Sequence, residues 1–195
     1  LCLFNDVAST SSILWHIERN RKRLTMNVLK EYVVQQGRKR EPLVRVLAYC
    51  MMGNHYHLLL EEIREGGITQ FMRKLGTGYA KYFNKKHDRV GVLFQSRFKN
   101  ILVDDERYVQ YLLVYINVLN PLGIVEPKWK EGILRNKRTA KNYLKEYRFS
   151  SYPDFIGEVR EENKILDNIL FPRYFDIVFA FVGDSTMTSV FAIYF

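Results

Sequence analysis

Two histidines separated by one residue are the candidate metal ligands of this chain. His55 and His57 lie in the apolar segment LAYCMMGNHYHLLL, residues 47–60. Side chains two apart on a strand point to the same face, roughly 7 Å apart along the backbone, so the two imidazoles converge. Neutral imidazole binds divalent metals, and two such ligands leave positions open for water, substrate and a third protein ligand. The alternative is that both histidines simply lie on a sheet face.

Apolar runs on both sides of the histidines predict the strands that position them. Residues 44–50 and 58–60 are strongly apolar, and Met52, Gly53 and Asn54 between them have the composition of a turn. We therefore expect a buried strand, a turn, and a second strand that carries both histidines.

Five segments together resemble the single-tyrosine HUH transposases, small insertion-sequence enzymes and relatives associated with repetitive extragenic palindromes. AYCMMGNHYHLLL resembles the histidine signature of that family, with Gly53 in place of the usual proline. The other segments follow in the family's order and spacing: YAKYFN (79–84), GVLFQSRFK (91–99), YINVLNP (115–121) and YRFSSY (147–152). Four ordered matches besides the histidine string cover about residues 3–157 and make a chance resemblance improbable.

The resemblance implies that Tyr115 is a catalytic nucleophile. In the family, the tyrosine at this position displaces a 3′ oxygen from a DNA phosphate and leaves a 5′-phosphotyrosine, which stores the bond energy for rejoining. A phenol with a pKa of about 10 needs assistance at neutral pH. A Mg²⁺ or Mn²⁺ ion held by His55 and His57 would polarise the phosphate and stabilise the leaving oxygen. Without the histidine motif, Tyr115 would be interpreted as a packed helix residue.

A third metal ligand is displaced by one residue relative to the family. Family members usually carry Asn or Gln four residues after the tyrosine, whereas this chain has Leu119 there and Asn120 next. Asn120 is therefore the predicted third ligand, on the condition that the last helical turn is wider than an α-turn. In an ordinary α-helix the metal shell would be incomplete.

Two long helices are predicted after the histidine strand. Apolar residues recur at helical spacing from Ile68 to Phe83 after the turn at Gly66 and Gly67, and a strand-like segment spans 92–103. The second helix begins after Asp104 and Asp105 and is expected to end at Asn120 and Pro121, and a short helix spans 139–147.

Basic and aromatic residues alternate around the first of these helices and the segment that follows it. Such interleaving suits a single nucleic-acid strand, because bases stack on aromatic rings while phosphates meet cations. A merely solvated face is the alternative for any one of the lysines. The predicted DNA-binding residues are Lys81, Tyr82, Lys85, Lys86, Arg89, Arg97 and Lys99.

The overall composition favours a globular protein with a polyanionic partner. The 195 residues are 47% hydrophobic, and 30 Lys and Arg against 21 Asp and Glu give a net charge of +9. Nucleic acid is the first candidate partner and an anionic membrane surface the second. Cys2 and Cys50 are too few for a disulfide framework, and Cys50 reads as a buried free thiol, so a reducing, cytoplasmic and nucleoid-associated location is expected.

We expect an α+β fold with a ferredoxin-like antiparallel sheet packed with helices. A transposase-like domain spans residues 1–157, and an apolar tail of unknown role spans 158–195. The chain opens where the family has already completed its first strand, which is central in such a sheet, so backbone groups beside the histidine strand would be exposed. Residues 174–195 are predicted to form two strands joined by a turn at Gly183 and Asp184, not a membrane helix.

The predicted function is a metal-dependent single-stranded DNA transposase that cleaves and rejoins strands through Tyr115. By family resemblance it acts on hairpin DNA as a homodimer, in which the tyrosine helix of one subunit can serve the histidines of the other. A catalytically inactive nucleic-acid-binding relic is the main alternative, and it would bind DNA without forming an adduct. A metal-dependent hydrolase in which Tyr115 is only a core residue is the third.

Overall fold

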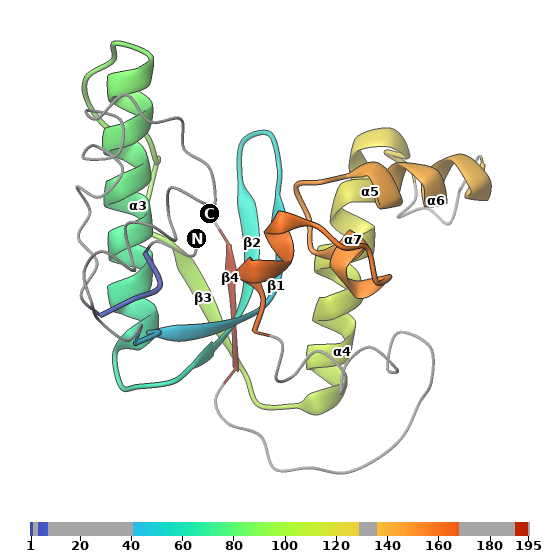
Figure 1. Ribbon diagram of the computed structural model, residues 1–195, viewed down its shortest axis with the longest axis horizontal. Coiled ribbons are helices and arrows are strands. Elements are labelled where there is room, and N and C mark those ends of the chain that lie inside the picture. Colours follow the sequence, from blue (N-terminus) through green and yellow to red (C-terminus); the bar gives the residue numbers. More distant parts are fainter. Residues whose placement is uncertain (2–3, 8–40, 129–135, 168–189, 195) are drawn as a thin grey trace. The chain divides into compact units, whose positions relative to one another are not determined.

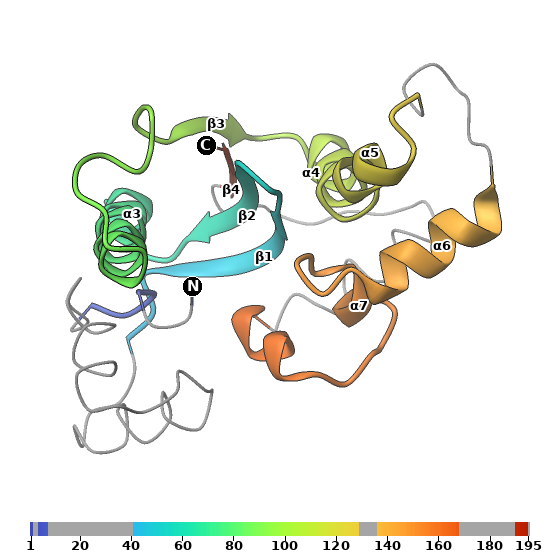
Figure 2. The same ribbon diagram turned by 90° about the horizontal axis from the view of Figure 1, so that it is seen from above.

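An antiparallel sheet and several helices give the chain an α+β fold, as predicted (Figure 1 and Figure 2). The computed structural model describes residues 1, 4–7, 41–128, 136–167 and 190–194. These form two compact units. The first comprises Leu1–Val44 with Glu62–Arg97, and the second comprises Arg45–Glu61 with Phe98–Phe195.

The sheet has four strands in the order β1-β2-β4-β3. They are β1 (Val44–Met51), β2 (Tyr56–Glu62), β3 (Lys99–Val103) and β4 (Val190–Tyr194). The first two strands form the predicted hairpin, which is closed by a hydrogen bond of 2.8 Å from Met52 N–H to the His55 carbonyl. The third strand is shorter than predicted, because regular pairing begins only at Lys99 and not at Val92.

A strand from the C-terminal tail lies inside this sheet. β4 pairs antiparallel with β2 on one edge and with β3 on the other, so that Ala192 lies opposite both Leu59 and Ile101. The position beside the histidine strand, which we expected to be vacant, is therefore occupied by β4. The tail thus contributes one strand of the predicted pair, and the expected turn at Gly183 and Asp184 lies outside the described residues.

The second long helix runs without interruption from α4 (Glu106–Val114) through η1 (Tyr115–Leu119) to α5 (Asn120–Val125). The Asp105 side chain caps it by accepting a hydrogen bond from Arg107 N–H. The prediction that it ends at Asn120 and Pro121 is wrong. In the π-helical turn η1 the Asn120 N–H donates to the Tyr115 carbonyl, five residues back. This wider turn accommodates Pro121, which has no N–H to donate.

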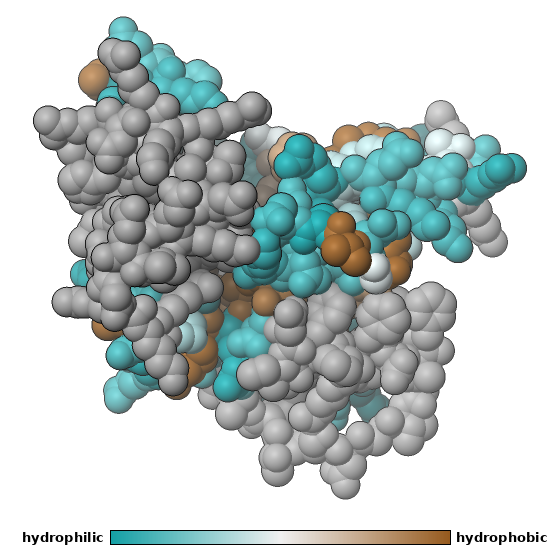
Figure 3. All heavy atoms as spheres, in the orientation of Figure 1, coloured by the Kyte–Doolittle hydropathy of each residue, from teal (hydrophilic) through white to brown (hydrophobic). Residues whose placement is uncertain are grey.

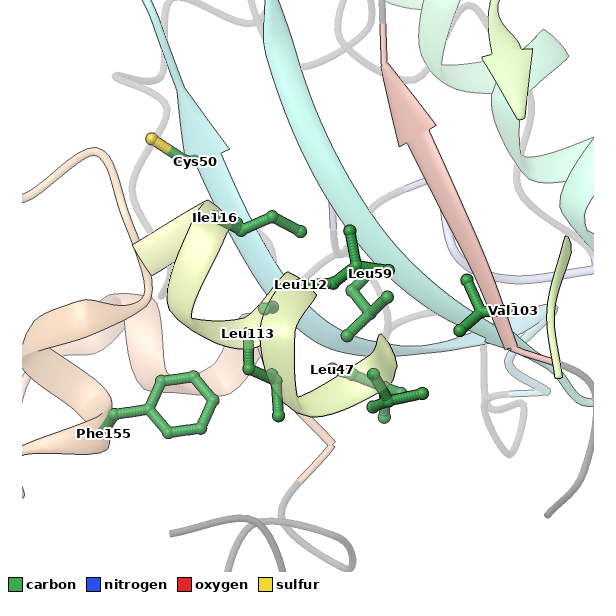
Figure 4. Close-up of a cluster of buried hydrophobic side chains, with 10 residues drawn as sticks. Leu47, Cys50, Leu59, Val103, Leu112, Leu113, Ile116 and Phe155 are labelled. Atoms are coloured by element: carbon green, nitrogen blue, oxygen red, sulfur yellow. The ribbon is translucent and has the colours of Figure 1, made fainter. Parts of the chain in front are cut away.

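The main core of the second unit lies between α4 and the sheet (Figure 4). One face of the helix supplies aliphatic side chains that meet residues of β1, β2 and β3, together with Phe155 of α7 (Tyr152–Phe155). Burial raises the pKa of the Cys50 thiol to about 12, and Cys50 is the buried free cysteine that the sequence predicts. Figure 4 labels the core residues Leu47, Cys50, Leu59, Val103, Leu112, Leu113, Ile116 and Phe155.

A smaller core joins α5 to α6 (Lys137–Glu146), which coincides closely with the predicted helix at 139–147. Ala140 and Leu144 pack with Leu122, and the Asn136 side chain caps the helix by accepting from Arg138 and Thr139 N–H. Figure 3 shows that the visible face of α6 is hydrophilic. The short 3-10 helix η3 (Glu161–Ile165) follows α7.

The first unit is built around α3 (Gly67–Lys86), the first predicted long helix. Phe71 and Met72 are its buried residues with the largest side chains. A Cβ atom at Gly67 would lie 2.4 Å from the Leu43 carbonyl oxygen, so the start of the helix requires glycine. The expected turn at Gly66 and Gly67 is confirmed, with Gly66 in the left-handed region at φ 71°.

One helix in the described part of the chain is long and apolar enough to cross a membrane, namely Glu106–Val125. Core helices of soluble proteins meet the same criterion. This helix buries its aliphatic face against the sheet of its own unit, which accounts for its apolar composition.

We predict that a proline in β4 disrupts the second unit. Ala192→Pro removes a backbone donor from a strand that is paired on both edges, so the free energy of unfolding should fall by about 3 kcal/mol or more. Ala192→Gly keeps the donor and should cost about 1 kcal/mol or less. Urea denaturation followed by circular dichroism measures both. Equal urea concentrations at the midpoint of unfolding for the two variants would show that β4 is not a central strand.

Candidate active site

The hairpin brings the two histidine rings together. His57 lies in β2, but His55 immediately precedes this strand. The prediction that one strand carries both histidines is therefore wrong for His55. The ring centroids are nevertheless 5.1 Å apart and the planes nearly perpendicular, at 83°. Metal–nitrogen bonds of about 2.1 Å permit two rings at this separation to share one ion.

Both histidines have surroundings that suit metal ligation. Nδ1 of His55 lies 2.7 Å from Oδ1 of Asn54, and a proton donated there leaves the Nε2 lone pair available. Burial, with a smaller contribution from neighbouring His55, lowers the pKa of His57 to about 4. His57 is therefore neutral at pH 7, and a neutral imidazole is the form that binds a metal.

Tyr115 lies beside His57 in the same chain. The two ring centroids are 5.7 Å apart and the planes are at 88°. Tyr115 is the first residue of η1 and is partly buried against the α4 core. The helix after β3 and the histidine hairpin therefore meet at this point within a single chain.

Asn120 follows Tyr115 by five residues, across the π-helical turn. The condition that we attached to Asn120, a turn wider than an α-turn, is met by η1. Nδ2 of Asn120 is buried and has no hydrogen-bond partner among the described residues. Rotation of the amide exchanges its nitrogen and oxygen, so either atom can occupy that position.

The donor set fits a divalent cation. In the parts of the chain that the structure describes, no three His, Cys, Asp or Glu side chains are placed so that they could hold one metal ion. Among the described residues a third ligand is therefore of another type, and Asn120 is the one at hand. Imidazole binds divalent metals and an amide oxygen suits Mg²⁺ or Mn²⁺. The positions left open would be filled by phosphate oxygens and water.

Lys99 is on the same face of the sheet as His57. Both residues lie opposite Tyr194, one from β2 and one from β3, so they occupy one row across the sheet. Directly opposed residues of antiparallel strands share a face, and two strand spacings separate them by about 10 Å at the backbone. Lys99 is exposed and can approach a phosphate bound in this row.

The other predicted DNA-binding residues belong to the first unit. Four of them lie in the last two turns of α3, and Arg89 follows the helix. The Lys86 ammonium lies 5.7 Å from the centre of the Tyr82 ring, and the Arg89 guanidinium lies 5.6 Å from that of Phe83. Cations and aromatic rings are thus interleaved, as predicted. The residues of the first unit in this set are Lys81, Tyr82, Lys85, Lys86, Arg89 and Arg97.

A buried polar connection holds η1 against β1, and sequence reasoning missed it. The Ser151 hydroxyl accepts a hydrogen bond from Tyr49 N–H at 3.0 Å and donates to Asn117 Oδ1 at 2.6 Å. Asn117 Nδ2 donates to the Leu113 carbonyl. Ser151 and Asn117 are almost completely buried. Asn117 is a polar residue in an otherwise apolar turn of helix, and that was the available signal.

Arg160 stabilises the segment that carries Ser151. Its guanidinium forms an ion pair with buried Asp154 and also donates to the Arg148 carbonyl, at 2.9 Å, and to the Tyr49 hydroxyl. Because Tyr49 is in β1, the Arg160 guanidinium connects residues 148–154 to the first strand of the sheet. The predicted YRFSSY segment is therefore an ordered support for the tyrosine helix.

A sheet with a histidine hairpin and a tyrosine-bearing helix beside it defines the class of site. The model of the IS200-like transposase family matches residues 9–118, more than half of the chain, and the chain belongs to this family. No curated protein and no solved structure matches the chain. Membership of a transposase family implies DNA binding and, at a coarse level, DNA cleavage.

The low pKa of His57 predicts an acid-sensitive fold. Between about pH 6.5 and pH 4 the unfolded chain binds a proton at His57 and the folded chain does not. The free energy of unfolding should therefore decrease as the pH falls through this range, and less steeply in His57→Gln. Urea denaturation at a series of pH values, with chelator present, measures the difference. Parallel curves for the two proteins would contradict the prediction.

Proposed function

We propose that this protein is a metal-dependent transposase that cleaves and rejoins single-stranded DNA through a 5′-phosphotyrosine at Tyr115. The observation that carries the proposal is the distance of 5.7 Å between the Tyr115 ring and His57, itself 5.1 Å from His55. Family membership supports the general activity, and this geometry supports the assignment of residues.

In the proposed reaction the Tyr115 oxygen attacks the phosphorus atom of the scissile phosphate. The new O–P bond replaces the bond from phosphorus to the 3′ oxygen, which leaves as a 3′ hydroxyl. The phenol proton passes to solvent and the leaving oxygen gains one. Because one phosphodiester bond replaces another, the step needs no external energy source. Rejoining is the reverse attack by a 3′ hydroxyl on the phosphotyrosine.

His55, His57 and Asn120 would hold the divalent cation. When bound, such an ion supplies positive charge to the phosphate and to the leaving oxygen. The chain's own contribution is to orient these groups. Asn54 orients His55, burial keeps His57 neutral, and η1 sets Asn120 five residues after Tyr115. Lys99, on the face of His57, would neutralise a neighbouring phosphate.

The proposed substrate is a DNA hairpin with a single-stranded flank, because a duplex would hold the bases away from protein side chains. The basic and aromatic end of α3 would bind the backbone of this strand. A net charge of +9 supports a polyanionic partner. A homodimer in the cytoplasm, associated with the nucleoid, is the proposed working state.

We predict a covalent protein–DNA adduct that depends on Tyr115. Purified protein and an end-labelled hairpin oligonucleotide from the flanks of its gene, incubated with Mn²⁺, should give a slower band on a denaturing gel. The band should disappear in Tyr115→Phe, which lacks the nucleophilic oxygen, and fall by at least about a hundredfold in His57→Ala.

Tyr143→Phe is the matched control for this assay. Tyr143 lies in α6, outside the site, and its substitution should leave the adduct unchanged. An adduct that persists in Tyr115→Phe would disprove the assigned nucleophile. Binding without any adduct in the parent would identify the protein as an inactive relic of the family.

We also predict that Asn120 contributes to metal binding. Isothermal titration of Mn²⁺ should show at least about tenfold weaker binding for Asn120→Ala and for His57→Ala. Asn120→Asp keeps an oxygen ligand and should retain or improve the affinity. An unchanged affinity in Asn120→Ala would exclude this residue from the metal shell. Because titration does not depend on DNA cleavage, the result stands apart from the adduct assay.

A further inference from the structure

We propose that one face of the continuous helix α4–η1 binds unpaired nucleobases next to the cleaved phosphate. This face carries Tyr108, Tyr111 and Tyr115, which we call the tyrosine row. The inference rests on the proposed function for its substrate, single-stranded DNA. It adds a base-stacking site that neither the family match nor the predicted site residues include.

The three rings form one continuous row that ends at the histidines. Tyr108 and Tyr111 are stacked with centroids 6.1 Å apart and planes at 10°. Tyr111 and Tyr115 are stacked at 5.9 Å and 26°. Tyr115 then contacts the edge of His57. Spacings of three and four residues put all three side chains on one helix face.

The row is not required for the core of its unit. A different face of the helix supplies the buried side chains, among them Val109, Leu112 and Ile116. By contrast, Tyr111 is 52% exposed and Tyr108 is 38% exposed. The solvated face of a helix ordinarily carries charged residues, so adjacent exposed aromatic rings indicate a binding surface.

Unpaired bases are the ligand that this surface fits. Planar rings with exposed surface stack on bases of any sequence, and the bases of a duplex are not available for this contact. The row is continuous with the nucleophile, so nucleotides joined to the attacked phosphate must pass close to it. Exposed Arg107, beside Tyr108, and Lys99 in the row of His57 provide cations for the intervening phosphates.

Binding should be measured in the Tyr115→Phe background, which keeps the ring and forms no adduct. The probes are a fluorescein-labelled hairpin oligonucleotide with a single-stranded flank and the same oligonucleotide with abasic sites throughout the flank. Tyr111→Leu should raise the Kd for the intact flank about tenfold. It should leave the Kd for the abasic flank unchanged, because no base remains to stack.

Two further variants separate stacking from other effects. Tyr111→Phe keeps the aromatic ring and should bind as the background protein does. Phe149→Leu removes a ring of similar exposure, 55%, on another segment of the same unit and should also leave binding unchanged. The factor by which Tyr111→Leu raises the Kd for the intact flank should be the same at low and high salt, because stacking does not release counterions.

Three results would overturn the tyrosine row. The first is that Tyr111→Leu binds the intact flank as tightly as the background protein does. The second is that Tyr111→Leu loses the same factor of affinity for the intact and the abasic flank. The third is a change of oligomeric state in Tyr111→Leu, measured by sedimentation, which would make the row a subunit interface. The proposed reaction is judged separately, with the parent protein in the adduct assay. Tyr111-dependent binding without an adduct refutes only the reaction, and an adduct without Tyr111-dependent binding refutes only the row.

Discussion

Pairing of β4 on both of its edges is the interaction on which the second unit depends. Backbone hydrogen bonds from this one strand connect the histidine strand to β3. Residues of β2 and β3 line up with each other only because both strands pair with β4. The row of His57 and Lys99 is an example, since Tyr194 lies between them. The face that packs on α4 likewise combines Leu59 with Val103 from strands that do not touch each other. A sheet without β4 would have two unpaired inner edges.

The helix on this sheet has one apolar, buried face and one face that carries tyrosines. The π-helical turn changes the side of the helix on which Asn120 lies. An α-helix returns to the same face after three or four residues, so Asn120, five residues on, would be rotated away from Tyr115 by about 140°. The extra residue in η1 offsets that rotation. The same turn lets the helix continue through Pro121 to the small core with α6.

Local patterns predicted most of the elements, and long-range pairing accounts for what they missed. The hairpin, α3, α6 and the cap at Asp105 follow from alternation, helical spacing and residue preferences, which are properties of neighbouring residues. The place of β4 between β2 and β3 depends on partners more than 80 residues away. Ser151 and Asn117 are likewise 34 residues apart, and only the structure brings them together. The position of Asn120 was predictable only as a condition, because sequence does not reveal an isolated π-turn.

The serine connection between η1 and β1 determines how readily Tyr115 could leave its own histidines in the proposed homodimer. For Tyr115 to leave the histidines of its own chain, the helix must separate from the sheet. That movement breaks the buried hydrogen bond from the Ser151 hydroxyl to Asn117 Oδ1 and leaves this oxygen without its partner. Each buried group left without a partner costs about 1–3 kcal/mol. The connection therefore favours a Tyr115 that serves the histidines of its own chain, and an exchange of tyrosine helices in the proposed homodimer would first have to break this hydrogen bond.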